Sequence, residues 1–227
     1  MAQPRRLDQR IAKWRRWLQG QIRSEVLTMN LHRDTYLEYR RIIDANDLLP
    51  ESYFWEFVYD LYGSSQSSAI RRLVDPHSDG VSLRRLMTEV EEACRLVTLE
   101  YFLGMYPSGD GQRIAQAQRW WRRSFAGEVG DHVDPEIVGA DLNELIAATT
   151  EVAQYVDRHL AHSDARPVRP DLLPTLNDAH ESIDVISQLF QRYHLLITGD
   201  AVAVHPQVLG DWRAVFRQPW TADADDE

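Results

Sequence analysis

Residues 134–163, DPEIVGADLNELIAATTEVAQYVDRHLAHS, decide the fold. Asp134 is a residue type that caps helix N-termini, and Pro135 fits the first helical position, so a helix is expected to begin here. Mostly apolar side chains then recur at three- and four-residue spacing, which predicts the buried stripe of an amphipathic helix. This stripe consists of Leu142, Leu145, Ile146, Thr149, Val152, Val156 and Leu160.

The opposite face of this helix is polar. At about 100° per residue it gathers Glu144, Glu151, Tyr155, Arg158 and His162. The core does not need these side chains, so an arginine, a histidine and carboxylates on one face form a candidate site. His159 and His162 are three residues apart, but no third ligand accompanies them, and we therefore predict no metal site.

Further helices are expected over residues 5–29, 34–45, 51–62, 82–106, 110–127 and 174–198. In the fourth of these, Leu83, Leu86, Val90, Cys94, Val97 and Tyr101 are expected to point inward, and in the last, Gly199 suits a C-cap. No segment alternates at period two over a useful length. The fold class is therefore predicted as all-α, an antiparallel helical bundle with additional N-terminal and C-terminal helices. Its core is expected from residues 82–106, 134–163 and 174–198, which have the clearest apolar stripes.

One aromatic segment leaves an alternative open. In residues 51–62, ESYFWEFVYDLY, the spacing of Phe54, Phe57, Val58 and Leu61 favours a core-facing helix over an aromatic platform that stacks nucleic-acid bases. The next six residues, GSSQSS at 63–68, have the composition of a loop. The 110–127 helix carries RWWRR at 119–123.

The two ends of the chain differ in charge. Residues 1–23 contain seven basic side chains against Asp8 alone, a local charge of +6. Ile11, Trp14, Leu18, Ile22 and Val26 share one side of this first helix, so its basic face is either solvated or contacts RNA or a membrane. We expect one helical domain over residues 1–220, with a basic N-terminal helix in 1–30 and an acidic disordered tail at 221–227. Residues 211–220, DWRAVFRQPW, are expected to fold back through Trp212, Phe216 and Trp220.

Composition bounds the class of protein. With 227 residues, 44% of them hydrophobic, the chain can bury a core as one large domain. A net charge of −10 argues against a general nucleic-acid coat. The single cysteine, Cys94, lies in an apolar stripe and is expected to be a small buried hydrophobe.

No apolar run approaches about 20 residues and no signal peptide pattern occurs, which predicts a cytoplasmic protein without a membrane span. Glycine-rich nucleotide loops are absent, and no cofactor is predicted.

Several segments together resemble a known family. RRLVDPHSDGVSLRRL at 71–86, the helix that ends in RHLAHSD, the long closing helix and DWRAVFRQPW resemble the HEPN-like family of abortive-infection type U proteins over roughly residues 30–220. The resemblance implies a helical bundle, often dimeric, acting in antiviral (abortive infection) or toxin–antitoxin systems. Many HEPN proteins are metal-independent ribonucleases built on Arg-x(4–6)-His, with both subunits contributing to one cleft. The resemblance also implies that this protein forms a homodimer, cleaves an RNA substrate and has an antitoxin partner.

The chain departs from that motif. Arg158 and His162 give Arg-x3-His, although residues four apart share a helix face. The literal spacing occurs only between Arg71 or Arg72 and His77, where Pro76 breaks the helix.

The chemistry that the resemblance implies is attack of an RNA 2′-hydroxyl on the adjacent phosphate. His162 would move the proton, and Arg158 would hold the phosphate. Tyr155, Glu151 and Asp164 are the expected substrate-binding residues. The alternative is a non-catalytic dimerisation or partner-binding module with a degraded motif.

Overall fold

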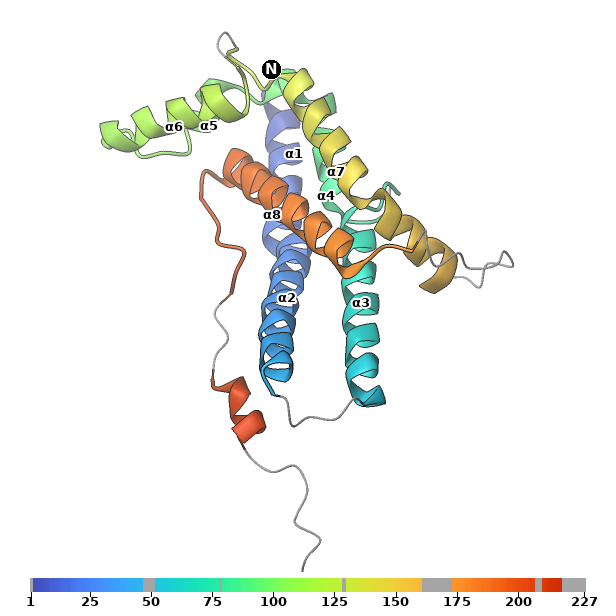
Figure 1. The fold of residues 1–227 in the computed structure, drawn as a ribbon. Coiled ribbons are helices and arrows are strands. Elements are labelled where there is room, and N and C mark those ends of the chain that lie inside the picture. Colours follow the sequence, from blue (N-terminus) through green and yellow to red (C-terminus); the bar gives the residue numbers. More distant parts are fainter. Residues whose placement is uncertain are drawn as a thin grey trace, which may run out of the picture.

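The computed structural model describes residues 2–46, 52–77, 79–127, 130–160, 173–206 and 210–217. These residues form an all-α structure (Figure 1). The α-helices are α1 (Ala2–Trp17), α2 (Arg23–Asp44), α3 (Tyr53–Leu73), α4 (Leu83–Glu92), α5 (Leu99–Leu103), α6 (Gly111–Ser124), α7 (Pro135–Tyr155) and α8 (Leu176–Thr198). The structure also contains two π-helical turns, η1 (Leu18–Ile22) and η3 (Val156–Leu160). Two short 3-10 helices are η2 (Cys94–Leu96) and η5 (Trp212–Arg217). In the described ranges the only β pairing is an isolated bridge, so the predicted fold class is confirmed.

Residues 2–44 form one long N-terminal element instead of the two predicted helices. α1 continues through η1 directly into α2, and residues 30–33 remain helical. No glycine or proline interrupts the sequence between these predicted helices, so nothing there ends the helix. The one irregularity is Gly20, whose φ of −100° and ψ of −108° lie outside the helical range. The predicted apolar side is buried along its whole length, at Ile11, Trp14, Leu18, Ile22 and Val26.

α3 corrects two predictions. It runs without interruption through residues 63–68, which were expected to be a loop, because Gln66 and Ser67 are buried where α3 packs against α2, α7 and α8. Tertiary packing here overrides weak helix propensity. The prediction that the apolar side of residues 51–62 faces the core is also wrong, because Phe54, Phe57 and Leu61 are exposed.

The helix predicted over residues 82–106 is divided. α4 ends at Glu92, a 3-10 turn follows, and the Thr98 side chain caps α5 by accepting a hydrogen bond from Tyr101 N at 3.2 Å. The chain between them pairs with a later segment, since Leu99 N donates to Asp131 O and Val133 N donates to Val97 O. The predicted inward residues Leu83, Leu86, Val90, Cys94 and Val97 are nevertheless buried, whereas Tyr101 is partly buried.

The core lies where α7 packs against α3, α4 and α8, and where the N-terminal element packs against α8. Val97 and Ile186 are both fully buried, as predicted. The N-terminal element also contributes to the core, with Trp14 fully buried. α8 ends at Gly199, which takes the left-handed φ of 77° expected of a C-cap. None of the helices in the described ranges is both long and apolar enough to cross a bilayer.

Candidate functional site

The segment that carries the candidate site is α7 and the π turn that follows it. α7 begins as predicted, with the Asp134 carboxylate accepting a hydrogen bond from Glu136 N at 2.9 Å and with proline in the first turn. Its predicted stripe is buried from Leu142 to Val156 except for Ile146, which is partly buried, whereas Leu160 is 39% exposed and does not belong to the core. The helix then widens into η3 (Val156–Leu160). A π turn closes i→i+5 hydrogen bonds, so each residue advances by a smaller angle around the axis.

A polar cleft of about 450 Å³ lies between the end of α7 and the start of α8. We call it the Arg158 cleft. It is lined by Glu151, Gln154, Tyr155, Arg158, His159, Leu173, Pro174, Thr175 and Asp178. The structure therefore brings together three of the predicted site residues, namely Glu151, Tyr155 and Arg158. His162 and Asp164 lie outside the described residues.

Arg158 is the free cation of this cleft. Its side chain is exposed and makes no hydrogen bond or ion pair within the described residues. The nearby carboxylate of Asp178 is engaged at the start of α8, where it accepts hydrogen bonds from Thr175 N at 2.6 Å and Thr175 Oγ1 at 2.8 Å. An unpaired guanidinium at the mouth of a polar cleft is suited to hold a phosphate.

His159 is a cleft residue that the sequence did not single out for catalysis. It lines the cleft beside Arg158, and its ring centroid lies 5.6 Å from that of Tyr155. In a regular α-helix neighbouring residues diverge by about 100°, and the π turn reduces this step, which helps to bring both side chains to one cleft. The sequence gives no dependable signal for a π turn. Among the described residues no group of three or more metal-ligating side chains is found.

A second polar cleft of about 580 Å³ adjoins the first. Its α3 wall consists of Tyr59, Asp60, Gly63, Ser64 and Ser67. Tyr155 and residues 173–175 line both clefts. The candidate site therefore lies at the junction of α3, α7 and α8. This α3 wall could not be predicted from the sequence, because its residues were assigned partly to a loop.

The literal Arg-to-His spacing at residues 71–77 is occupied by a structural ion pair. Arg71 Nε lies 2.7 Å from Asp157 Oδ1, and Arg71 Nη1 lies 3.3 Å from Asp75 Oδ1, which connects the end of α3 to η3. Partial burial opposes ionisation of Asp75, but the backbone N–H of His77 and the Arg71 guanidinium bring the pKa of this carboxyl below its ordinary value. Arg71 is thus engaged with two carboxylates and supports the π turn that carries Arg158.

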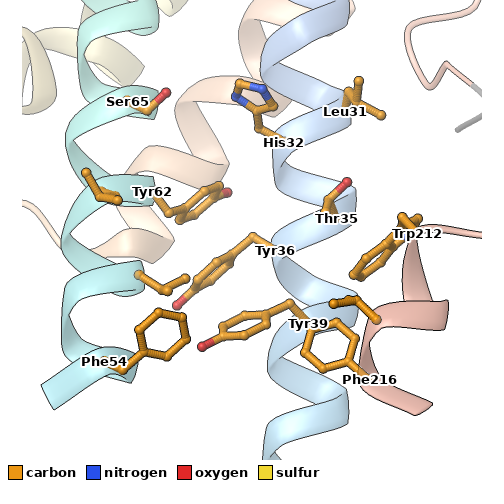
Figure 2. Close-up of a pocket in the computed structure, with 13 residues that line it drawn as sticks. Leu31, His32, Thr35, Tyr36, Tyr39, Phe54, Tyr62, Ser65, Trp212 and Phe216 are labelled. Carbon is orange, nitrogen blue, oxygen red and sulfur yellow. The ribbon is translucent and has the colours of Figure 1, made fainter. Parts of the chain in front are cut away.

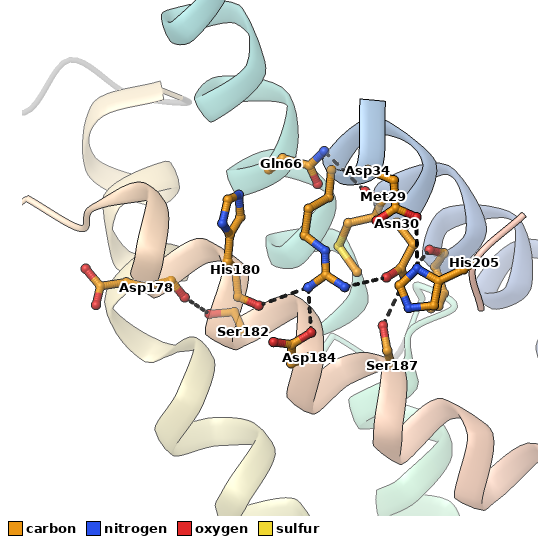
Figure 3. A network of polar contacts seen from close by, with 12 residues as sticks. Met29, Asn30, Asp34, Gln66, Asp178, His180, Ser182, Asp184, Ser187 and His205 are labelled. Carbon is orange, nitrogen blue, oxygen red and sulfur yellow. Dashed lines mark hydrogen bonds and ion pairs between the residues drawn. The ribbon is translucent and has the colours of Figure 1, made fainter. Parts of the chain in front are cut away.

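A second arginine and histidine meet deeper in the bundle, where α2, α3 and α8 pack (Figure 3). The buried Arg33 side chain lies 2.5 Å from Asp184 Oδ1 and donates to Asn30 Oδ1 at 3.1 Å. It also reaches the backbone carbonyl of His180, not its ring. Asn30 in turn donates to Ser187 Oγ at 2.9 Å. This network joins α2 to α8.

The His180 ring has a different partner. Its Nε2 lies 2.8 Å from the Tyr62 hydroxyl, and the Tyr62 ring stacks on Tyr36 with centroids 3.9 Å apart. Burial lowers the pKa of the His180 imidazole below its ordinary value, and the charge of Arg33 lowers it further. Neither Arg33 nor His180 lines the two polar clefts. This pair therefore stabilises the helix packing, and the Arg158 cleft remains the better candidate site.

Comparison with known families agrees with this architecture. A family model for the AbiU2 HEPN proteins matches residues 11–215. The match begins earlier than the resemblance seen in the sequence, so residues 11–17, the second half of α1, are part of it. No curated protein and no solved structure matches the chain. The chain belongs to the HEPN-like AbiU2 family, whose members are associated with abortive infection.

Proposed function

We propose that this protein is a metal-independent endoribonuclease of a toxin-like, abortive-infection system, with its active site in the Arg158 cleft. The observation that carries the proposal is the unpaired Arg158 beside His159 and Tyr155 in a polar cleft, four residues before His162. An arginine and a histidine can supply the charge stabilisation and the proton transfer that cleavage by an RNA 2′-hydroxyl needs. No bound metal ion is needed for this reaction.

In the proposed reaction the 2′-hydroxyl oxygen attacks the adjacent phosphorus and the bond to the 5′-oxygen of the next nucleotide breaks. His162 takes the proton from the 2′-hydroxyl or gives one to the leaving oxygen, because its ordinary pKa of about 6.5 suits both roles near neutral pH. Arg158 offsets the charge that develops on the phosphate. Tyr155, with Glu151 and Asp164, contacts the nucleotides on either side. His159 is placed to fulfil the role of His162 if the latter is dispensable.

The test is cleavage of RNA by the purified protein with EDTA present. Arg158→Ala and His162→Ala are expected to abolish cleavage, and loss of the acid–base group alone slows it on the order of 10²–10⁴-fold. His159→Ala shows which histidine acts. The matched controls are Arg72→Ala and His77→Ala, which remove the literal motif. Arg72 is exposed and paired with Glu25. Cleavage by Arg158→Ala at the wild-type rate, or cleavage abolished by EDTA, would contradict the proposal.

A second function, a dimerisation module, is favoured by an apolar surface at the open end of α2 and α3. The described chain exposes Leu37 on α2 and Tyr53, Phe54, Phe57, Tyr59 and Leu61 on α3. Beside them lies a groove of about 550 Å³. Figure 2 shows its aromatic walls, with Tyr36 and Tyr39 of α2 between the α3 residues Phe54 and Tyr62 and the η5 residues Trp212 and Phe216.

We propose that a second copy of the chain covers this surface in a homodimer. Exposed apolar side chains around an apolar groove mark sites of protein–protein contact, and a two-fold axis lets the same surface serve both subunits. Two pairs of α2 and α3 helices would then form a four-helix layer. Tyr59 is exposed and also lines the second polar cleft, so this interface would bring the candidate sites of the two subunits closer together.

Light scattering tests the homodimer. Phe57→Asp combined with Leu61→Asp is expected to give a monomer at micromolar concentration, whereas Leu160→Asp, an exposed leucine on η3, leaves the dimer intact. A wild-type monomer would remove the basis for this interface. Loss of RNA cleavage in the monomeric variant supports a site completed by both subunits. A stable dimer that never cleaves RNA supports the non-catalytic module instead.

An antitoxin partner is tested by co-expression with neighbouring genes.

A further inference from the structure

The proposed function makes no use of the RWWRR segment of α6. α6 projects away from the helical bundle together with α5 (Figure 1). Trp121 fixes how the helix is rotated, because its ring is fully buried against Phe102, with centroids 5.5 Å apart, and its Nε1 donates to Gly130 O at 3.2 Å. The opposite side of α6 consequently faces outward.

That outward side is positively charged and unpaired. Arg119, Arg122 and Arg123 are exposed, and within the described ranges none of them makes a hydrogen bond or an ion pair. α6 contains no acidic residue, and its fourth arginine, Arg113, is engaged with the capping Asp110 at 3.2 Å. In a chain with a net charge of −10, three free arginines on one short helix form a local binding surface for a polyanion.

A pocket of about 450 Å³ lies against the side of α6 that carries Arg113, Gln116 and Trp120. Its α6 wall includes Trp120 and Gln116, which at about 100° per residue neighbour Arg119 and Arg123 on the helix surface. Tyr106 forms another part of the wall, and its buried hydroxyl oxygen makes no hydrogen bond to any described residue. A buried polar atom without a partner, at the wall of a pocket, points to a ligand that supplies one.

We infer that α6 and this pocket bind single-stranded nucleic acid. The phosphates lie on Arg119, Arg122 and Arg123, and one unstacked base enters the pocket against Trp120. Asp200, which also lines the pocket, faces the polar edge of that base. Asp200 repels phosphate and so favours this orientation. A lipid surface or an acidic protein would use the arginines but not the aromatic pocket, which is why a single strand is the better fit.

This inference goes beyond the proposed function, because binding at α6 requires neither the Arg158 cleft nor cleavage. The experiment measures fluorescence anisotropy of a labelled single-stranded DNA of about 15 nucleotides at several salt concentrations. DNA lacks the 2′-hydroxyl and cannot be cut by the proposed chemistry, so a failure of cleavage cannot be confused with a failure of binding. The variants are Trp120→Ala and the triple variant Arg119→Gln, Arg122→Gln, Arg123→Gln.

The matched control is the triple variant Arg40→Gln, Arg41→Gln, Arg72→Gln, which removes the same charge from arginines paired with Asp44, Glu38 and Glu25. Wild type and control are expected to bind alike. The α6 triple variant should lower the slope of log Kd against log salt by about two, because each phosphate contact in a single strand contributes about 0.7. Trp120→Ala should weaken binding on the order of ten-fold.

Three results would overturn the inference. One is no binding of the single strand by the wild-type protein. Another is an equal loss of binding in the control triple variant, which would assign the effect to net charge. The third is equal binding of duplex DNA or of anionic phosphatidylglycerol vesicles with no effect of Trp120→Ala, which would make α6 a general anionic-surface contact.

Discussion

Removal of the charge of Arg33 tests how α2 is joined to α8. The Arg33→Met substitution removes the hydrogen bond of 3.1 Å that the buried Asn30 amide oxygen accepts from the guanidinium. It also removes the counter-ion of the Asp184 carboxylate. The two consequences differ in size. Asn30 is fully buried, whereas the side chain of Asp184 is 69% exposed and returns to water.

The expected cost of Arg33→Met in unfolding free energy is about 2 kcal/mol, since an unsatisfied buried acceptor costs about 1–3 kcal/mol. Asp184→Ala has a similar cost of about 2 kcal/mol, because it leaves the Arg33 guanidinium, only 10% exposed, without a counter-ion. This value is below the usual cost of breaking a buried pair because water reaches the Asp184 end. Once Arg33 is absent, removing the exposed Asp184 should cost less than about 0.5 kcal/mol.

The double variant is therefore expected to be about as stable as Arg33→Met alone, with a coupling energy near 2 kcal/mol. Urea unfolding followed by circular dichroism measures all four proteins, and an unchanged m-value shows that the same surface unfolds in each. Additive losses, near 4 kcal/mol in the double variant, would refute a direct dependence of the two groups on each other. Losses under about 0.5 kcal/mol in both single variants would show an ordinary surface ion pair.

Three further outcomes are expected. Because the pKa of His180 is lowered in the folded state, the unfolded chain binds its proton more readily, so stability is complete above pH of about 6.5 and falls as the pH is lowered toward the folded pKa. Thermal melts should show a flatter pH dependence for His180→Gln, and an unchanged profile would contradict this. Burial raises the pKa of the Cys94 thiol to about 11, so the native protein should react with an aromatic disulfide reagent far more slowly than the protein in urea. Thr175→Ala removes the capping box of α8 and should cost about 1 kcal/mol by urea unfolding, and no shift of the midpoint would show that the cap is dispensable.

The sequence by itself determined the helices whose signals are local. The start of α7 at Asp134 and Pro135, its buried stripe and the C-cap at Gly199 follow from side-chain chemistry within a few residues. The period of the apolar residues also identified the buried side of the N-terminal element. Arg158, Tyr155 and Glu151 were placed on one face for the same reason, and they line one cleft.

Only the tertiary structure decided features that depend on partners distant in sequence. Residues 63–68 are helical because α2, α7 and α8 pack around α3, and no local signal in a serine-rich segment predicts that packing. Phe57 and Leu61 have the spacing of core residues, but both are exposed, and Leu61 lines an open groove instead of the core. A pattern records which side chains share a face, whereas burial requires a second surface to lie against that face.

The π turn of η3 has the same origin. It brings His159 to the cleft beside Arg158, and the ion pair from Arg71 to Asp157 supports it across 86 residues of sequence. The buried Arg33 network likewise depends on side chains from two helices that meet only in the folded chain. Helix periodicity could name the polar face of α7, but the walls that turn this face into a cleft come from α3 and α8, through contacts that no local pattern encodes.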